Sequence, residues 1–116
     1  METDIDLEVE KMGNISIIQA SGDLDTFTCA KLREAICDLI ENGCSRIVIN
    51  IADVNYIDSS GLGTLVGGLR RVAEKNGGLA IAGANPQVQK VFTITGLCKV
   101  FKLFDDNKQA ANSLKS

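Results

Sequence analysis

The sequence predicts an α/β fold in which one mixed β-sheet of about four to five strands carries about four packed helices. A hairpin pattern opens the chain, β-branched runs then alternate with helical patterns, and Gly, Asn or Pro marks the changes between them. Because the 116 residues are 45% apolar, the chain is long enough to bury one core. We therefore expect a single domain over 1–116, with a core at about 5–105 and a C-terminal helix or tail at 106–116.

The N-terminal part is expected to form a hairpin followed by a helix. Apolar and acidic residues alternate along 5–11, which is the period of a half-exposed strand. The pair Gly13-Asn14 has turn chemistry and separates this strand from a second one at 15–20. A helical spacing of apolar residues begins near Cys29 and should end at the C-cap signal Asn42-Gly43.

A buried strand and a long amphipathic helix are expected in the middle of the chain. The β-branched run 46–51 is typical of a strand covered on both faces. We interpret the stretch 53–63 as the loop that leads from this strand into the helix. The apolar stripe expected to face the core consists of Leu62, Leu65, Val66, Leu69, Val72 and Ala73. The opposite side of the helix is expected to hold Thr64, Gly68, Arg71 and Lys75.

The C-terminal part predicts a strand, a capped helix, a last strand and a terminal helix. A glycine pair precedes a short buried strand at 79–82, and Asn85 with Pro86 has the chemistry of a helix start. The inward face of this helix should be formed by Val88, Val91, Phe92 and Thr95. Gly96 should end the helix, a strand is expected at 100–104, and a terminal helix at 107–114.

Composition argues against several classes of function. A net charge of −3 with scattered basic residues does not favour nucleic acid as a partner. The chain has no histidine and its four cysteines lack Cys-x-x-Cys spacing, so we expect neither a metal site nor a redox role for the cysteines. Position 66 is Val66 rather than the third glycine of a dinucleotide fingerprint, and no P-loop is present, so we expect no cofactor. Without an apolar run of membrane-spanning length or a signal peptide, a cytoplasmic protein without membrane association is expected.

The polar group of greatest interest lies where the long helix should begin. Asp58, Ser59 and Ser60 follow the buried strand, and the first turn of a helix has unpaired N–H groups and a positive dipole end. One interpretation is a simple N-cap, since Asp and Ser are preferred caps. The other is a phosphorylation site, because those N–H groups can hold a phosphate on either serine.

Three stretches of the chain resemble motifs of one protein family. They are Gly22-Asp-Leu-Asp-Thr-Phe-Thr-Cys29, Tyr56-Ile-Asp-Ser-Ser-Gly-Leu-Gly63, and the segment 86–97 that ends in Thr-Gly-Leu. Together, and in this order, they resemble the bacterial anti-sigma-factor antagonists, whose fold is called the STAS domain. The similarity covers nearly the whole chain, from about Ile5 to about Asp105.

The resemblance implies a partner-switching regulator of transcription. The unmodified protein would bind an anti-sigma factor that is also a serine kinase, and so free a sigma factor for sporulation or a stress response. The kinase would phosphorylate Ser60, with Ser59 as the second choice, and a serine phosphatase would reset the switch. The residues expected to orient this site or to contact the partner are Asp23, Asp25, Asp58, Ser59, Gly61, Leu62 and Gly63.

Two other functions remain open at this point. A scaffold subunit of a stress-signalling assembly would have a similar STAS domain but would associate with itself, whereas a dissociable switch should be mainly monomeric. A nucleotide or small-ligand module would use the same helix N-terminus to hold a ligand phosphate. An enzyme is the weakest alternative, because Ser60 has only Asp, Glu or Lys as a base, and we expect no catalytic residue.

Overall fold

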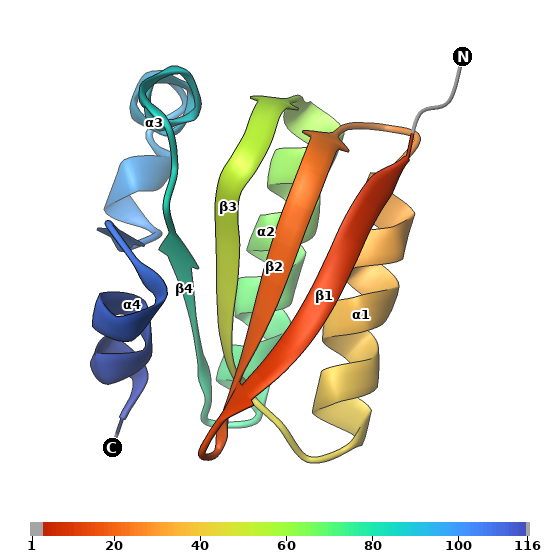
Figure 1. Ribbon diagram of the computed structural model, residues 1–116, viewed down its shortest axis with the longest axis vertical. Helices are drawn as coiled ribbons and strands as arrows, with labels where there is room; N and C mark the ends of the chain where they lie inside the picture. Colours follow the sequence, from red (N-terminus) through yellow and green to blue (C-terminus); the bar gives the residue numbers. More distant parts are fainter. Residues whose placement is uncertain (1–3, 116) are drawn as a thin grey trace.

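The sheet has five strands in the order β1-β2-β3-β4-β5, and the computed structural model describes residues 4–115 (Figure 1). β1 (Ile5–Met12) and β2 (Ile15–Leu24) form the expected antiparallel hairpin. β2 then pairs in parallel with β3 (Arg46–Ile57), β3 with β4 (Gly78–Ala82), and β4 with the short β5 (Leu103–Phe104). The sheet is therefore mixed, as the sequence predicts.

Helices cover the two faces of the sheet unequally. α1 (Cys29–Glu41) and α2 (Ser59–Glu74) lie side by side behind the sheet in Figure 1 and, with α3 (Pro86–Ile94), enclose the main core. α4 (Asn107–Leu114) covers a smaller core on the other face, over β3 and β4. None of the helices within residues 4–115 is both long and apolar enough to span a bilayer.

A buried amide fastens α4 to the sheet. Asn50 of β3 donates from Nδ2 to Asn107 Oδ1 at 2.7 Å, and its Oδ1 accepts from Gln19 Nε2 at 3.1 Å. The same oxygen accepts from the Ala52 N–H at 2.9 Å. Because both polar atoms of the Asn50 side chain have hydrogen-bond partners, its burial to 8% exposure costs less than that of an unpartnered amide.

Several helix and strand signals are confirmed. Asn85 accepts a hydrogen bond from the Val88 N–H at 2.9 Å as the N-cap of α3, and Pro86 is the first helical residue. Asn42 is the C-cap of α1, and Gly96 ends the α3 region with a φ of 78°. Each of these residues takes the helix-end role that its residue type favours.

Two strand predictions are wrong in length. β3 continues to Ile57, so the loop expected at 53–63 is reduced to Asp58. The strand expected at 100–104 is only two residues long, because the 3₁₀ helix Leu97–Lys99 precedes it and Phe101 turns inward. The ring of Phe101 packs edge-on against Phe92, with centroids 5.8 Å apart.

Four positions lie on the other side of their helix from the one expected. Thr64 and Gly68 are buried because α2 packs against α1 as well as the sheet, and Ile36 of α1 would touch a β-carbon on Gly68. Ala73 is exposed, since Val72 already fills the core in that turn. Thr95 is also exposed and donates its hydroxyl to the Val91 carbonyl at 2.8 Å.

Candidate functional site

Parallel pairing of β2 with β3 brings two loops together at one edge of the sheet. Leu24 pairs with Ile57 at the ends of these strands, so the segment 25–28 and the start of α2 meet at the top of Figure 1. The neighbouring positions of β2 and β3 in the sheet are what bring the two loops together.

Asp58 joins the two loops with a single carboxylate. Its Oδ1 accepts a hydrogen bond from the Gly61 N–H at 3.0 Å, which makes Asp58 the N-cap of α2. Its Oδ2 accepts from the N–H of Thr26 at 3.2 Å and from the Thr26 hydroxyl at 3.3 Å. The capping interpretation is therefore correct for Asp58, and the same side chain also holds the neighbouring loop.

The two serines differ in their surroundings. Ser60 is half-buried, and its Oγ lies 3.1 Å from Thr26 Oγ1. Ser59 is exposed at the first position of α2. Thus Thr26 connects the Ser60 hydroxyl with the Asp58 carboxylate, although the sequence analysis did not select it. A threonine two residues beyond the end of β2 could have been found once the order β2-β3 was known.

Asp23 and Asp25 lie close to this group without bonding to Ser60. Asp25 Oδ1 accepts from the N–H groups of Phe27 at 2.9 Å and Thr28 at 3.1 Å, which closes the turn before α1. The Asp23 side chain is exposed, and the backbone carbonyl of Asp23 accepts a hydrogen bond from the Thr28 hydroxyl at 2.7 Å. Asp25 therefore shapes the loop that presents Thr26.

The two motif glycines have different environments. A β-carbon on Gly61 would collide with the Leu24 carbonyl oxygen and would lie 2.8 Å from Leu24 Cγ. A β-carbon on Gly63 would meet nothing within 4 Å. Leu62 between them is 8% exposed and belongs to the main core. Gly61 and Leu62 hold α2 on the sheet, whereas Gly63 leaves open surface beside Ser60.

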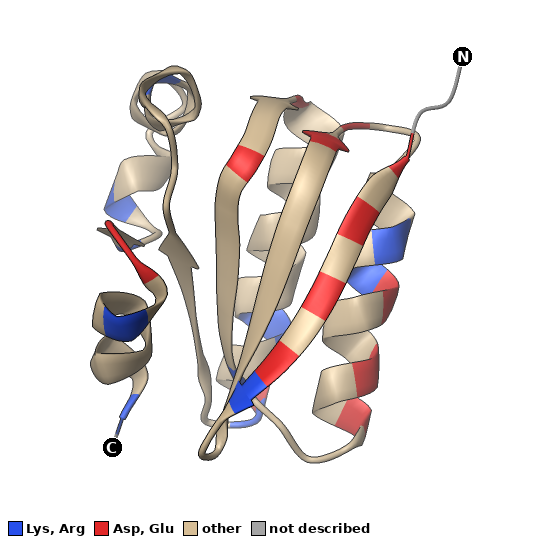
Figure 2. Ribbon diagram, in the orientation of Figure 1, with Lys and Arg blue, Asp and Glu red and all other residues tan. Residues whose placement is uncertain are grey.

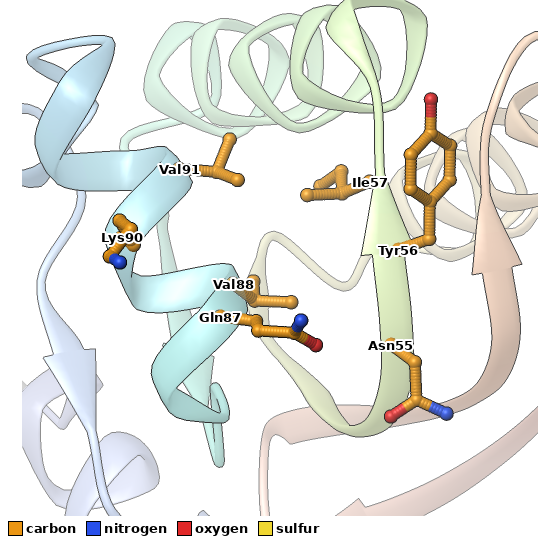
Figure 3. Close-up of a pocket in the computed structure, with 7 residues that line it drawn as sticks. All are labelled: Asn55, Tyr56, Ile57, Gln87, Val88, Lys90 and Val91. Carbon is orange, nitrogen blue, oxygen red and sulfur yellow. The ribbon is translucent and has the colours of Figure 1, made fainter.

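Two exposed aromatic side chains lie close in sequence to the residues of the site. Phe27, next to Thr26, is 76% exposed, and Tyr56, two residues before Asp58, is 55% exposed. Beyond Tyr56 an open cleft of about 340 Å³ separates the end of β3 from α3. Figure 3 shows Ile57, Val88 and Val91 pointing into this cleft, while the Tyr56 ring points away from α3. Such exposed aromatic groups are typical of protein-docking surfaces.

Hydrogen bonding keeps Asp58 ionised. The Gly61 N–H is the main cause of the lowered pKa of Asp58, from an ordinary 3.8. Desolvation opposes it, and the N–H groups of Thr26 and Ser60 together with the Thr26 hydroxyl lower the pKa further. The group at the head of α2 is thus an anion near neutral pH. Within residues 4–115, no cluster of three or more Cys, Asp or Glu side chains is arranged to hold a metal ion.

Comparisons with known proteins agree on one family. The model of the STAS domain matches residues 6–110. The chain is 29% identical over 112 residues to an anti-sigma F factor antagonist of Paenibacillus polymyxa, covering 96% of each chain. It is 30% identical over 93 residues to an anti-sigma-B factor antagonist of Staphylococcus aureus, covering 80% of this chain and 86% of the relative.

A solved structure of low sequence identity shares the fold. It is the Bacillus cell fate determinant SpoIIAA in its phosphorylated form, with a TM-score of 0.72 and 24% identity, covering 93% of this chain and 98% of that one.

The glycine environments predict opposite effects of the same substitution. Gly61→Ala should lower the free energy of unfolding by about 2 kcal/mol, because the new methyl group overpacks against the backbone of β2. Gly63→Ala should raise it by about 0.5–1 kcal/mol, since alanine is favoured in an open helix position. Urea unfolding followed by far-UV circular dichroism measures both. Equal effects would contradict the assigned contacts.

The lowered pKa of Asp58 predicts a pH-dependent contribution to stability. The unfolded chain takes up the proton near pH 3.8 and the folded protein only at lower pH, so the contribution is complete above pH 3.8 and is lost as the pH falls through the folded pKa. Asp58→Asn retains a capping oxygen but cannot ionise. The wild type should exceed Asp58→Asn in unfolding free energy near neutral pH, and the difference should shrink below pH 3.8. A difference that is constant with pH would contradict this assignment.

Proposed function

This chain belongs to the STAS domain family of anti-sigma factor antagonists, and from that premise we propose that it is a phosphorylation-controlled partner switch. In this proposal the unmodified protein binds an anti-sigma factor with serine kinase activity and thereby frees a sigma factor. Phosphorylation of Ser60 ends the complex, and a serine phosphatase restores the binding form. The protein acts in the cytoplasm, as a regulator rather than an enzyme.

The observation that carries the proposal is the position of the Ser60 hydroxyl. It lies in the first turn of α2 and contacts Thr26, whose chain neighbour Phe27 is exposed, and the exposed Tyr56 lies four residues before it in the sequence. A kinase that docks on these aromatic groups would meet the serine within the same interface. Aromatic anchors supply large contact area with few rotatable bonds, which suits a docking surface that must form and dissociate.

The fold can accept a phosphate at this point. Ser60 is the second residue of α2, where backbone N–H groups and the helix dipole favour an anion. The phosphorylated form of SpoIIAA, which has the same fold as this chain, supports this part of the proposal.

The same phosphate would oppose the complex. It adds a charge of about −1.5 to −2 at neutral pH. Through Thr26, the Ser60 oxygen is two hydrogen bonds away from the Asp58 carboxylate, so the new charge lies close to an existing one. Burying the phosphate and the Asp58 carboxylate together in an interface costs several kcal/mol, and each 1.4 kcal/mol reduces the affinity about tenfold. The free protein avoids that penalty because water solvates the phosphate.

The kinase supplies the chemistry of transfer. ATP and magnesium belong to its own site, so the substrate serine needs no catalytic partner in this chain. This division agrees with a chain that has no histidine and offers no metal cluster within residues 4–115.

Serine variants should separate the bound and released states. In a pull-down from native lysate with ADP, Ser60→Ala and the wild type should retain the anti-sigma factor, and Ser60→Asp should retain at least tenfold less, because its carboxylate imitates the phosphate. With ATP added, the wild type should lose the partner while Ser60→Ala keeps it. Mass spectrometry identifies the retained protein and the modified residue.

The matched control is the neighbouring serine. Ser59→Asp adds the same charge at an exposed position and should retain far more partner than Ser60→Asp. If Ser60→Ala and Ser60→Asp retain the anti-sigma factor equally, the proposed switch is wrong. If Ser59→Asp is the variant that releases it and mass spectrometry finds the phosphate on Ser59, the acceptor is Ser59.

We also propose that the free protein is mainly monomeric, because the sheet edge formed by β1 is protected by charge. Asp6, Glu8 and Glu10 alternate with apolar residues along this strand and produce the acidic bands in Figure 2. Charged side chains on an edge strand disfavour pairing with a second copy. Light scattering at rising protein concentration should give the mass of one chain, 12.4 kDa. A stable dimer or larger assembly would favour the scaffold alternative.

A further inference from the structure

A polar groove runs between α1 and α2 and begins at Ser60. It has a volume of about 380 Å³. Its lining residues are Cys29 and Arg33 from α1, and Ser60, Gly63, Thr64, Gly67 and Arg71 from α2. The two helices start at the same edge of the sheet and run side by side (Figure 1). The lining residues of α2 extend from Ser60 to Arg71, so the groove leads away from the serine.

Both charged groups that line the groove are basic. Arg33 and Arg71 are exposed, and within residues 4–115 the only ion pair joins Lys31 to Asp4. Their guanidinium groups therefore have no carboxylate partner among the described residues. The groove carries a formal charge of +2 on a chain whose net charge is −3.

Two glycines keep the floor of the groove free of side chains. A β-carbon on Gly63 would have nothing within 4 Å, and one on Gly67 would meet only Arg71 Nη1, at 3.3 Å. The fold does not require glycine at either position, and each costs about 1 kcal/mol in a helix relative to alanine. An open floor lets another backbone approach the two arginines closely.

We propose that this groove binds an acidic segment of the anti-sigma factor, with carboxylates of that segment paired to Arg33 and Arg71. The inference rests on the proposed function and adds the chemistry of the contact. Guanidinium groups bind carboxylates in a two-pronged geometry, and complementary charge steers the two proteins together. The groove is continuous with Ser60, so docking there would hold the serine at a fixed place relative to the kinase.

Phosphorylation of Ser60 would also promote release of the anti-sigma factor by changing the charge of the groove. A phosphate of about −1.5 to −2 charge at the mouth of the groove offsets nearly all of its positive charge. The acidic segment then loses its electrostatic attraction and meets repulsion from the phosphate. Phosphorylation thus weakens the complex along the groove as well as beside Asp58.

The test uses the full-length chain and the purified anti-sigma factor that the Ser60→Ala variant retains. Affinity is measured by titration calorimetry at low and moderate salt for Arg33→Gln, Arg71→Gln and the control Arg70→Gln. Arg70 is exposed on the same helix and does not line the groove. The two groove variants should each bind at least fivefold more weakly, with a shallower dependence of affinity on salt, and Arg70→Gln should match the wild type.

Two outcomes would overturn the inference and leave the proposed function unaffected. If all three variants bind like the wild type, the groove is not part of the interface. A second outcome is that Arg33→Gln and Arg71→Gln bind the anti-sigma factor normally, but in their phosphorylated forms melt at a lower temperature than the phosphorylated wild type. The two arginines would then hold the phosphoserine of this chain instead. A failure of the proposed function is recognised separately, because no anti-sigma factor would then be retained by Ser60→Ala at all.

Discussion

The parallel pairing of β2 with β3 is the constraint on which the site depends. Since Leu24 lies beside Ile57, the chain that leaves β2 and the chain that enters α2 must share one edge of the sheet. A contact between residues 26 and 58 then requires no long side chain and no loop of unusual shape. The site is a consequence of register, and a shift of one residue would turn each strand's side chains to the opposite face.

Asp58 holds the start of α2 and the loop after β2 in a fixed arrangement. One oxygen caps α2, and the other holds the backbone and hydroxyl of Thr26. The serine that we propose as the phosphate acceptor rests on the same threonine. A phosphate on Ser60 would therefore change the charge next to both loops, and neither loop needs to move far. This arrangement suits a switch that changes surface charge while the core of the sheet remains intact.

Residues with strong local chemistry could be placed from the sequence, and those whose role depends on a partner element could not. Asn85, Pro86 and Gly96 each act on the helix end at which they lie, without help from another element, so their positions were predicted correctly. Thr64 was expected on the exposed side because it lies outside the apolar stripe of α2, but α2 packs against α1 as well as the sheet and Thr64 is buried. The extension of β3 past Ile51 was missed for a similar reason. Its residues Asp53 and Val54 are strand because they pair with Ser21 and Gly22 of β2, whatever their own preference.

The motif at the start of α2 contains residues that the fold requires and residues that it does not require. The sequence alone does not distinguish the two groups. Gly61 is needed by the fold, because β2 occupies the space of its β-carbon, and Leu62 is needed by the core. Ser60 and Gly63 satisfy no comparable demand: one hydroxyl contacts a neighbouring hydroxyl, and one glycine faces open space. A glycine in a helix where alanine would be more stable contributes nothing to the stability of the fold. The groove that begins at Ser60 provides an explanation, since a partner can use the space that a side chain at position 63 would fill.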